Sequence, residues 1–67
     1  MNLRLEPRSG VPIYVQIINQ IKYLVASGQL EPGAQLPTIR QLAVNLTIDP
    51  NTVARAYMEL DREGIIS

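Results

Sequence analysis

Hydrophobic residues recur at helical spacing in three separate stretches of this chain. The first stretch follows Pro12, which suits the first turn of a helix because the N–H it lacks would be unpaired there anyway. Its apolar stripe consists of Tyr14, Ile17, Ile18, Ile21, Leu24 and Val25. The positions that fall largely outside the stripe are Gln16, Asn19, Gln20, Lys22, Tyr23 and Ser27. This pattern predicts a first helix that ends at Gly28, which tolerates a left-handed cap.

Two further helices are indicated by their start signals. Thr38 and Gln41 have the spacing of a capping box, in which the side chain of each bonds the backbone N–H of the other. Asp49 followed by Pro50 marks another start, because Asp is a favoured N-cap and Pro is favoured directly after it. The predicted buried faces are Ile39, Leu42, Ala43 and Leu46 for one helix, and Val53, Ala56, Tyr57 and Leu60 for the next. Gly64 is expected to end the last helix.

The segments between and around these helices are predicted to be short and mostly irregular. Residues 1–11 are interpreted as an extended lead-in, and residues 29–37 as a connector with a turn at Glu31-Pro32-Gly33-Ala34. Within the connector, Gln35-Leu36 is compatible with a very short strand. At the other end, Ile65-Ile66-Ser67 is interpreted as the opening of a strand.

The short spacing between the second and third helices favours a helix-turn-helix from about Thr38 to Glu63. Ala43 is small enough to let the two helices cross closely, and Ile48 fills the corner after the turn. A crossing at about 90–120° over a turn of three or four residues is the geometry of a DNA-binding helix-turn-helix. Thr47 occupies the turn position where glycine is common, and a positive φ there would cost about 1–3 kcal/mol. Helical hairpins of this spacing also occur in proteins that do not bind DNA, so spacing alone leaves both functions open.

The outward face of the third helix favours DNA. With Val53 in the core, the opposite side carries Asn51, Arg55, Met58 and Arg62. Asn pairs bidentately with adenine and Arg with guanine, and Asn51 and Arg55 lie on the first two turns, where a recognition helix meets base edges. For Arg55, DNA contact is favoured over a solvated pair with Glu59. For Arg62, a solvated face paired with an acidic neighbour, Glu59 or Glu63, is favoured instead.

Phosphate contacts are expected beside these base contacts. Asn51 and Thr52 lie near the positive end of the helix, where exposed N–H groups favour phosphate. Arg40, in the first turn of the preceding helix, is placed to contact the DNA backbone. The candidate DNA-binding residues are therefore Arg40, Asp49, Pro50, Asn51, Thr52 and Arg55.

Composition limits what else the chain does. Its 67 residues allow one small domain, and no apolar run approaches the length of a membrane span or follows the start as in an export signal, so a cytoplasmic protein is expected. Without cysteine or histidine, with Lys22 as the only lysine and with no phosphate-binding glycine loop, neither an enzyme nor a metal or cofactor site is expected. The net charge of zero, taken alone, opposes DNA binding, because non-specific affinity comes mainly from neutralising phosphates.

A block of motifs runs from about Pro12 to Ile66. It consists of Pro12-Ile13-Tyr14-x-Gln16-Ile17, then Gly28-x-Leu30-x-Pro32-Gly33-x-x-Leu36-Pro37-Thr38-x-Arg40-x-Leu42-Ala43, then Asn51-Thr52-Val53-x-x-Ala56-Tyr57-x-x-Leu60-x-x-Glu63-Gly64-Ile65-Ile66. These motifs resemble the GntR family, bacterial regulators with an N-terminal winged helix-turn-helix. The segment from Asp49 to Tyr57 is most similar to the YtrA-like subfamily. A similar Arg-Ala-Tyr occurs in the aminotransferase-fused MocR subfamily, so both parents stay open.

The resemblance implies a mainly α, winged helix-turn-helix fold of three helices with a short or incomplete wing sheet. It also implies that Arg40 contacts phosphate and that Thr52 lies at the DNA backbone. Many members have arginine where this chain has Pro50 and Ala54, so Asn51 and Arg55 are expected to do more of the base reading. The family's basic wing is expected after Ser67, so the domain of residues 12–67 is expected to be truncated before it, and to lack that part of the family's basic surface.

The function expected is sequence-specific DNA binding, as the DNA-binding part of a bacterial repressor. The resemblance implies that the full-length parent binds a palindromic operator as a homodimer, and that any small-molecule effector binds outside these residues. One alternative is a protein-interaction module, supported by the neutral charge and by Val15, Tyr23 and Met58, which are expected to be exposed. Another is a MocR-type parent that carries pyridoxal phosphate in its other half.

Overall fold

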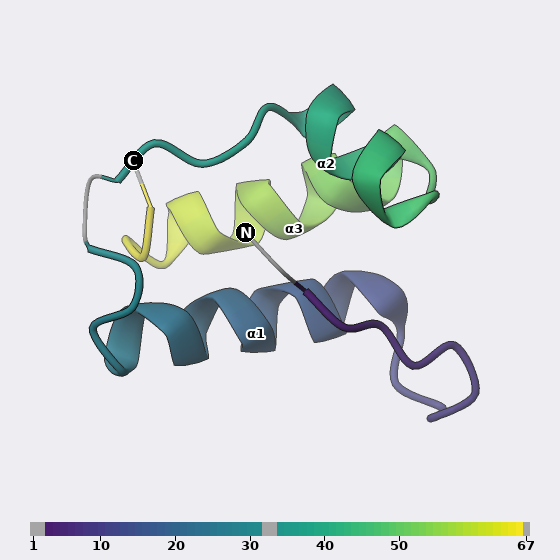
Figure 1. Ribbon diagram of the computed structural model, residues 1–67, viewed down its shortest axis with the longest axis horizontal. Coiled ribbons are helices and arrows are strands. Elements are labelled where there is room, and N and C mark those ends of the chain that lie inside the picture. Colours follow the sequence, from purple (N-terminus) through teal and green to yellow (C-terminus); the bar gives the residue numbers. More distant parts are fainter. Residues whose placement is uncertain (1–2, 32–33, 67) are drawn as a thin grey trace.

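Three helices make up the regular structure of this protein. The computed structural model describes residues 3–31 and 34–66 and contains α1 (Ile13–Ala26), α2 (Ile39–Leu46) and α3 (Pro50–Arg62). α3 packs against both of the other helices. In Figure 1, α1 and α3 run side by side in the same direction, and α2 lies near the start of α3. The predicted mainly α, three-helix architecture is confirmed.

The hydrophobic core is shared by all three helices. Its buried members are Ile17, Ile18 and Ile21 of α1, Leu42 and Ala43 of α2, and Val53, Ala56 and Leu60 of α3. Full burial of an isoleucine, leucine or valine side chain stabilises a fold by about 1.5–3 kcal/mol. Because α3 buries residues against partners on two sides, its orientation is fixed and its remaining face is left to solvent.

Three positions differ from the burial predicted from helical spacing. Ile39 was expected in the core but is 38% exposed, because it is the first residue of α2 and lies at the edge of the packed region. Val15 was expected to be exposed and is half-buried, whereas Tyr23 and Met58 are exposed as predicted. Gln16 was placed outside the apolar stripe and is buried.

Gln16 is buried because its amide group holds the lead-in against α1. Its Oε1 accepts the N–H of Glu6 at 2.7 Å, and its Nε2 donates to the carbonyl oxygens of Glu6 and Val11 and to Ser9 Oγ at 2.8–3.1 Å. The lead-in is also not simply extended, since the N–H of Ser9 donates to the carbonyl of Glu6 and closes a turn. The buried amide therefore replaces, for this turn, the hydrogen bonds of regular secondary structure.

Both predicted helix starts are confirmed. The Thr38 hydroxyl accepts the N–H of Gln41 at 3.1 Å, and the Gln41 side chain accepts the N–H of Thr38 at 2.9 Å, which completes the capping box of α2. Asp49 caps α3, and Pro50 is the first helical residue. Because both signals are local, α2 and α3 begin where the sequence places them.

The turn between α2 and α3 depends on a left-handed residue at Thr47. Its φ is +57°, and it is the one non-glycine residue with a positive φ among those the structure describes. The N–H of Thr47 donates to the carbonyl of Val44, and the N–H of Ile48 donates to that of Ala43. These two bonds form a Schellman-type end in which threonine stands where glycine is usual. The positive φ considered from the sequence is confirmed.

Residues 3–31 and 34–66 contain no strand. The strands expected at Gln35-Leu36 and from Ile65 are therefore not formed by these residues, and Ser67 lies outside the described residues. After Gly64, at φ +76°, the N–H of Ile65 donates to the carbonyl of Leu60 at 2.9 Å. The chain leaving α3 thus caps the helix instead of pairing with a strand.

The predicted turn in the connector lies partly outside the described residues, because it includes Pro32 and Gly33. Its two flanking residues are consistent with it, since the N–H of Ala34 donates to the carbonyl of Glu31 at 2.9 Å. An i to i+3 bond of this kind closes many four-residue turns.

Candidate nucleic-acid interface

The exposed face of α3 is polar at its start. Asn51 and Arg55 are both exposed, one helical turn apart, whereas Val53 and Ala56 between and beside them are fully buried. Met58 and Arg62 continue the exposed side toward the end of α3. The predicted division of this helix into a buried and an outward face is confirmed.

Arg55 is held by an aromatic ring from another helix. Its Cζ lies 3.9 Å from the centroid of the Tyr14 ring, within the range of a cation–π interaction. The sequence placed Tyr14 on the core stripe of α1, and it is half-buried at the edge of the core, beneath Arg55. Helical spacing missed this contact, because spacing within one helix does not say which residue of another helix lies opposite. An aromatic residue in the first turn of α1 was the one signal available.

Arg62 is engaged in an ion pair, as favoured from the sequence. Its Nη2 donates to Glu59 Oε2 at 2.5 Å, and this hydrogen bond is the main cause that raises the pKa of Arg62 above its usual value. A second ion pair joins Lys22 of α1 to Glu63 at 2.8 Å. In the part of the chain that the structure describes, neither ion pair uses Arg55. Its guanidinium charge is therefore available to a ligand.

The start of α3 is less open to phosphate than predicted. The Asp49 side chain accepts the N–H of Asn51 at 2.8 Å, and the Asp49 carbonyl accepts the N–H of Thr52 at 3.0 Å. The two amides expected to favour phosphate are therefore already bonded, and a carboxylate lies beside them. The hydroxyl of Thr52, a half-buried residue, can still donate to a phosphate oxygen at this end of the helix.

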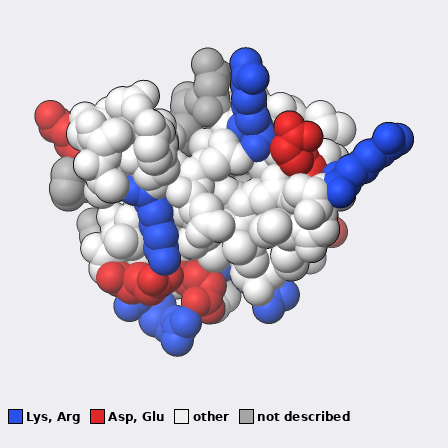
Figure 2. Space-filling model, turned by 90° about the horizontal axis from the view of Figure 1, so that it is seen from below, with Lys and Arg blue, Asp and Glu red and all other residues white. Residues whose placement is uncertain are grey.

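The remaining candidate residues lie at the starts of two different helices. Pro50 is exposed in the first turn of α3, and Arg40 is exposed in the first turn of α2. Asp49 to Arg55 thus form one continuous stretch, with Arg40 on the helix that packs against it. On the face shown in Figure 2, the Lys and Arg side chains stand apart, separated by uncharged and acidic surface. That scatter agrees with the net charge of zero.

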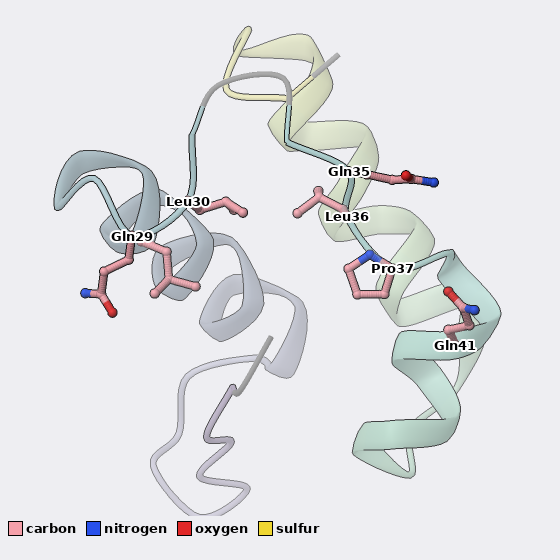
Figure 3. A pocket seen from close by; sticks show the side chains of 7 residues that line it. Gln29, Leu30, Gln35, Leu36, Pro37 and Gln41 are labelled. Atoms are coloured by element: carbon pink, nitrogen blue, oxygen red, sulfur yellow. The ribbon is translucent and has the colours of Figure 1, made fainter.

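An open hollow lies on the side of the connector. Leu30 and Leu36 face each other across it, and Gln29, Gln35 and Gln41 lie around them (Figure 3). The described residues that line it are uncharged, so the hollow does not suit phosphate. The candidate DNA-binding residues lie elsewhere, at the start of α2, on α3 and at the N-cap of α3.

The fold and the outward face of α3 define a helix-turn-helix DNA-binding domain. Residues 13–67 match the family described as "Bacterial regulatory proteins, gntR family". The chain belongs to the GntR family, whose members are DNA-binding transcription regulators and not enzymes. No helix among the described residues is long and apolar enough to span a membrane.

Named relatives agree with this assignment. The transcriptional repressor YtrA of Bacillus subtilis is 52% identical over 96% of this chain and 49% of the relative. The solved structure of YtrA from Sulfolobus acidocaldarius superposes with a TM-score of 0.89 at 45% identity, over 92% of this chain and 53% of the other. A transcriptional antiterminator from Listeria monocytogenes EGD-e gives 0.88 at 39% identity, over 92% and 46%. The predicted YtrA-like resemblance is confirmed, and the chain spans about half the length of the curated relatives it matches.

Proposed function

We propose that this domain reads operator DNA with α3 in the major groove, as part of a homodimeric repressor that acts in the cytoplasm. One observation carries the proposal: Asn51 and Arg55 are exposed one turn apart at the start of α3, while Val53 is fully buried behind them. This arrangement presents an adenine-pairing and a guanine-pairing side chain on one rigid surface. The repressor role is supported by the name of the Bacillus subtilis relative.

Each candidate residue has a role in this proposal. Arg55 donates to O6 and N7 of guanine, and Asn51 pairs with adenine. Arg40 and the hydroxyl of Thr52 contact phosphates, which position the domain without reading sequence. Asp49, together with Pro50, fixes the start of α3 against the DNA.

Two copies of the domain would occupy a palindromic operator. Dimeric helix-turn-helix proteins contact half-sites whose centres lie one helical turn apart, about 34–36 Å, or a multiple of it. We place the DNA-binding domain at residues 12–67, after the lead-in of residues 1–11, and any small-molecule effector site outside both.

A duplex selected from a random-sequence library by this chain provides the test. Arg55→Ala should weaken binding to the selected duplex by about 1–3 kcal/mol and relax the preference at one base pair per half-site. Arg40→Ala should weaken binding to selected and random duplexes alike and reduce the salt slope by about one. Arg62→Ala is the matched control, because the Arg62 guanidinium is paired with Glu59. This substitution should change neither the base preference nor the salt slope.

Two results would contradict the proposal. Equal losses on selected and random DNA for Arg55→Ala would remove its base-reading role. Duplex binding without salt dependence would instead favour a protein-interaction module.

A further inference from the structure

Arg55 and Tyr14 come together because α1 and α3 begin at the same end of the molecule (Figure 1). Tyr14 lies in the first turn of α1, which starts after Pro12, and its half-buried ring packs against the core. The ring is therefore a fixed surface, with the Arg55 Cζ 3.9 Å from its centroid. A planar guanidinium over such a ring is attracted by the negative charge of the π face.

The contact between Arg55 and Tyr14 does not use the same atoms of arginine as an ion pair does. In Arg62, an N–H on the edge of the guanidinium donates to Glu59, so that donor is occupied. In Arg55, the Cζ lies over the Tyr14 ring, and none of its guanidinium N–H groups donates a hydrogen bond to another of the described residues. Those edge donors are the groups that pair with O6 and N7 of guanine. Stacking on the ring and base pairing are therefore compatible in one side chain.

The contact also reduces the conformational entropy that the Arg55 side chain loses when it binds DNA. An unrestrained arginine side chain loses much rotamer freedom when it pairs with a base, and that loss weakens binding. A ring that restrains Arg55 in the free domain removes part of this loss before DNA arrives. The effect matters here because the chain has no net positive charge, so base contacts account for a larger share of its affinity.

We propose that Tyr14 is a specificity-determining positioning residue, which holds the Arg55 guanidinium in the orientation that reads guanine. The proposal rests on the proposed function, since it assigns a role to Tyr14 only if Arg55 contacts a base. Tyr14 itself contacts no DNA base in this arrangement and acts through Arg55.

The test compares two substitutions of the ring in the full chain. Tyr14→Phe keeps the π face, and Tyr14→Leu removes it while retaining apolar bulk. Binding is measured on the selected duplex, on the same duplex with the guanine pair read by Arg55 changed to A·T, and on a random duplex. Tyr14→Leu should lower the guanine preference about three- to tenfold, and Tyr14→Phe should preserve it. Neither should change affinity for the random duplex or the salt slope.

Two controls separate this role from packing. Tyr23→Leu alters an exposed tyrosine of the same helix and should leave the guanine preference unchanged. Tyr14→Leu in an Arg55→Ala background should produce no further loss. In the free domain, the ring-current shift of the Arg55 side-chain methylene protons should disappear in Tyr14→Leu and persist in Tyr14→Phe.

The outcomes distinguish this inference from the function it rests on. If Arg55→Ala lowers the guanine preference but Tyr14→Leu does not, or if Tyr14→Leu weakens all duplexes equally, the inference is wrong and the proposed function stands. Tighter binding by Tyr14→Leu would show that the ring withholds Arg55 from DNA, which also overturns the inference. If the unaltered chain shows no salt-dependent duplex binding, the proposed function fails and the inference fails with it.

Discussion

The carboxylate of Asp49 accepts the backbone N–H of Asn51 at 2.8 Å, so the residue that caps α3 also fixes the residue proposed to read adenine. The same carboxylate is exposed at the end of the helix that we propose approaches DNA. Asp49 therefore has two opposing effects, because its hydrogen bond stabilises the helix start while its negative charge repels phosphate.

Two substitutions of Asp49 separate the cap from the charge. Asp49→Asn keeps a good N-cap and removes the charge, so it should cost at most about 0.3–1 kcal/mol of stability, from the lost interaction with the helix dipole. Asp49→Ala removes both and should cost about 0.5–2 kcal/mol. Both should bind random duplex DNA more tightly at low salt than the unaltered chain does. Urea unfolding and duplex titrations measure the two effects, and equal stability of the two variants would contradict the capping role.

Thr47 stores strain in the turn before α3. A β-branched residue in the left-handed region costs about 1–3 kcal/mol, whereas asparagine tolerates that region. Thr47 is exposed, so its replacement removes little packing. Thr47→Asn should therefore raise the free energy of unfolding by about 1 kcal/mol and the melting temperature by about 4–8 °C. Thr47→Ala, which keeps a Cβ in the same conformation without the branch, should gain less, and an Asn variant no more stable than the Ala variant would show that strain is not relieved.

The helix starts were predictable because their causes are local. The Thr38 and Asp49 caps depend on residues two or three positions away, and the stripe that buries Val53 follows from helical period alone. The positive φ of Thr47 could also be anticipated from the sequence, because Thr47 occupies the turn position where glycine is common.

The missed features depend on how separate segments meet. The buried state of Gln16 requires the lead-in to fold back on α1, and the place of Arg55 requires Tyr14 to arrive from another helix. The strand expected from Ile65 was wrong for a related reason. Two β-branched residues favour a strand, but the N–H of Ile65 is used by the cap that follows Gly64. The sequence pattern indicates which secondary structure a residue prefers, but it does not say which hydrogen-bond partner its backbone N–H will find.

The Gln16 amide predicts unequal effects of two similar substitutions on α1. Gln16→Ala leaves groups of Glu6, Ser9 and Val11 without their partners and should cost about 1–3 kcal/mol. Gln20→Ala removes a more exposed pair with the backbone of the lead-in and should cost no more than about 0.5 kcal/mol. Urea unfolding gives both values, and hydrogen exchange at the Glu6 amide should accelerate in the first variant alone. Similar losses in the two variants would mean that the buried amide does not hold the lead-in.

Tyr57 links α3 to the connector through a hydrogen bond that depends on pH. Its hydroxyl donates to the carbonyl of Pro37 at 2.8 Å. Burial raises the pKa of Tyr57 above its usual value of 10.0, because the phenolate form would lose hydration. The folded state thus binds the proton more firmly than the unfolded state. The resulting stability is fully present below about pH 10 and is lost as the pH rises through the raised pKa.

Tyr57→Phe removes both the hydrogen bond and this titration. At pH 7 it should cost about 0.5–1.5 kcal/mol, the net value of one such bond. Above about pH 10, the unaltered chain should lose stability more steeply than the variant, so the difference between them narrows. Tyr23→Phe is the matched control, because Tyr23 is exposed, and it should leave both the stability at pH 7 and its pH dependence unchanged. A constant difference between the unaltered chain and Tyr57→Phe from pH 7 to pH 11, measured by urea unfolding, would show that the Tyr57 pKa does not change on folding.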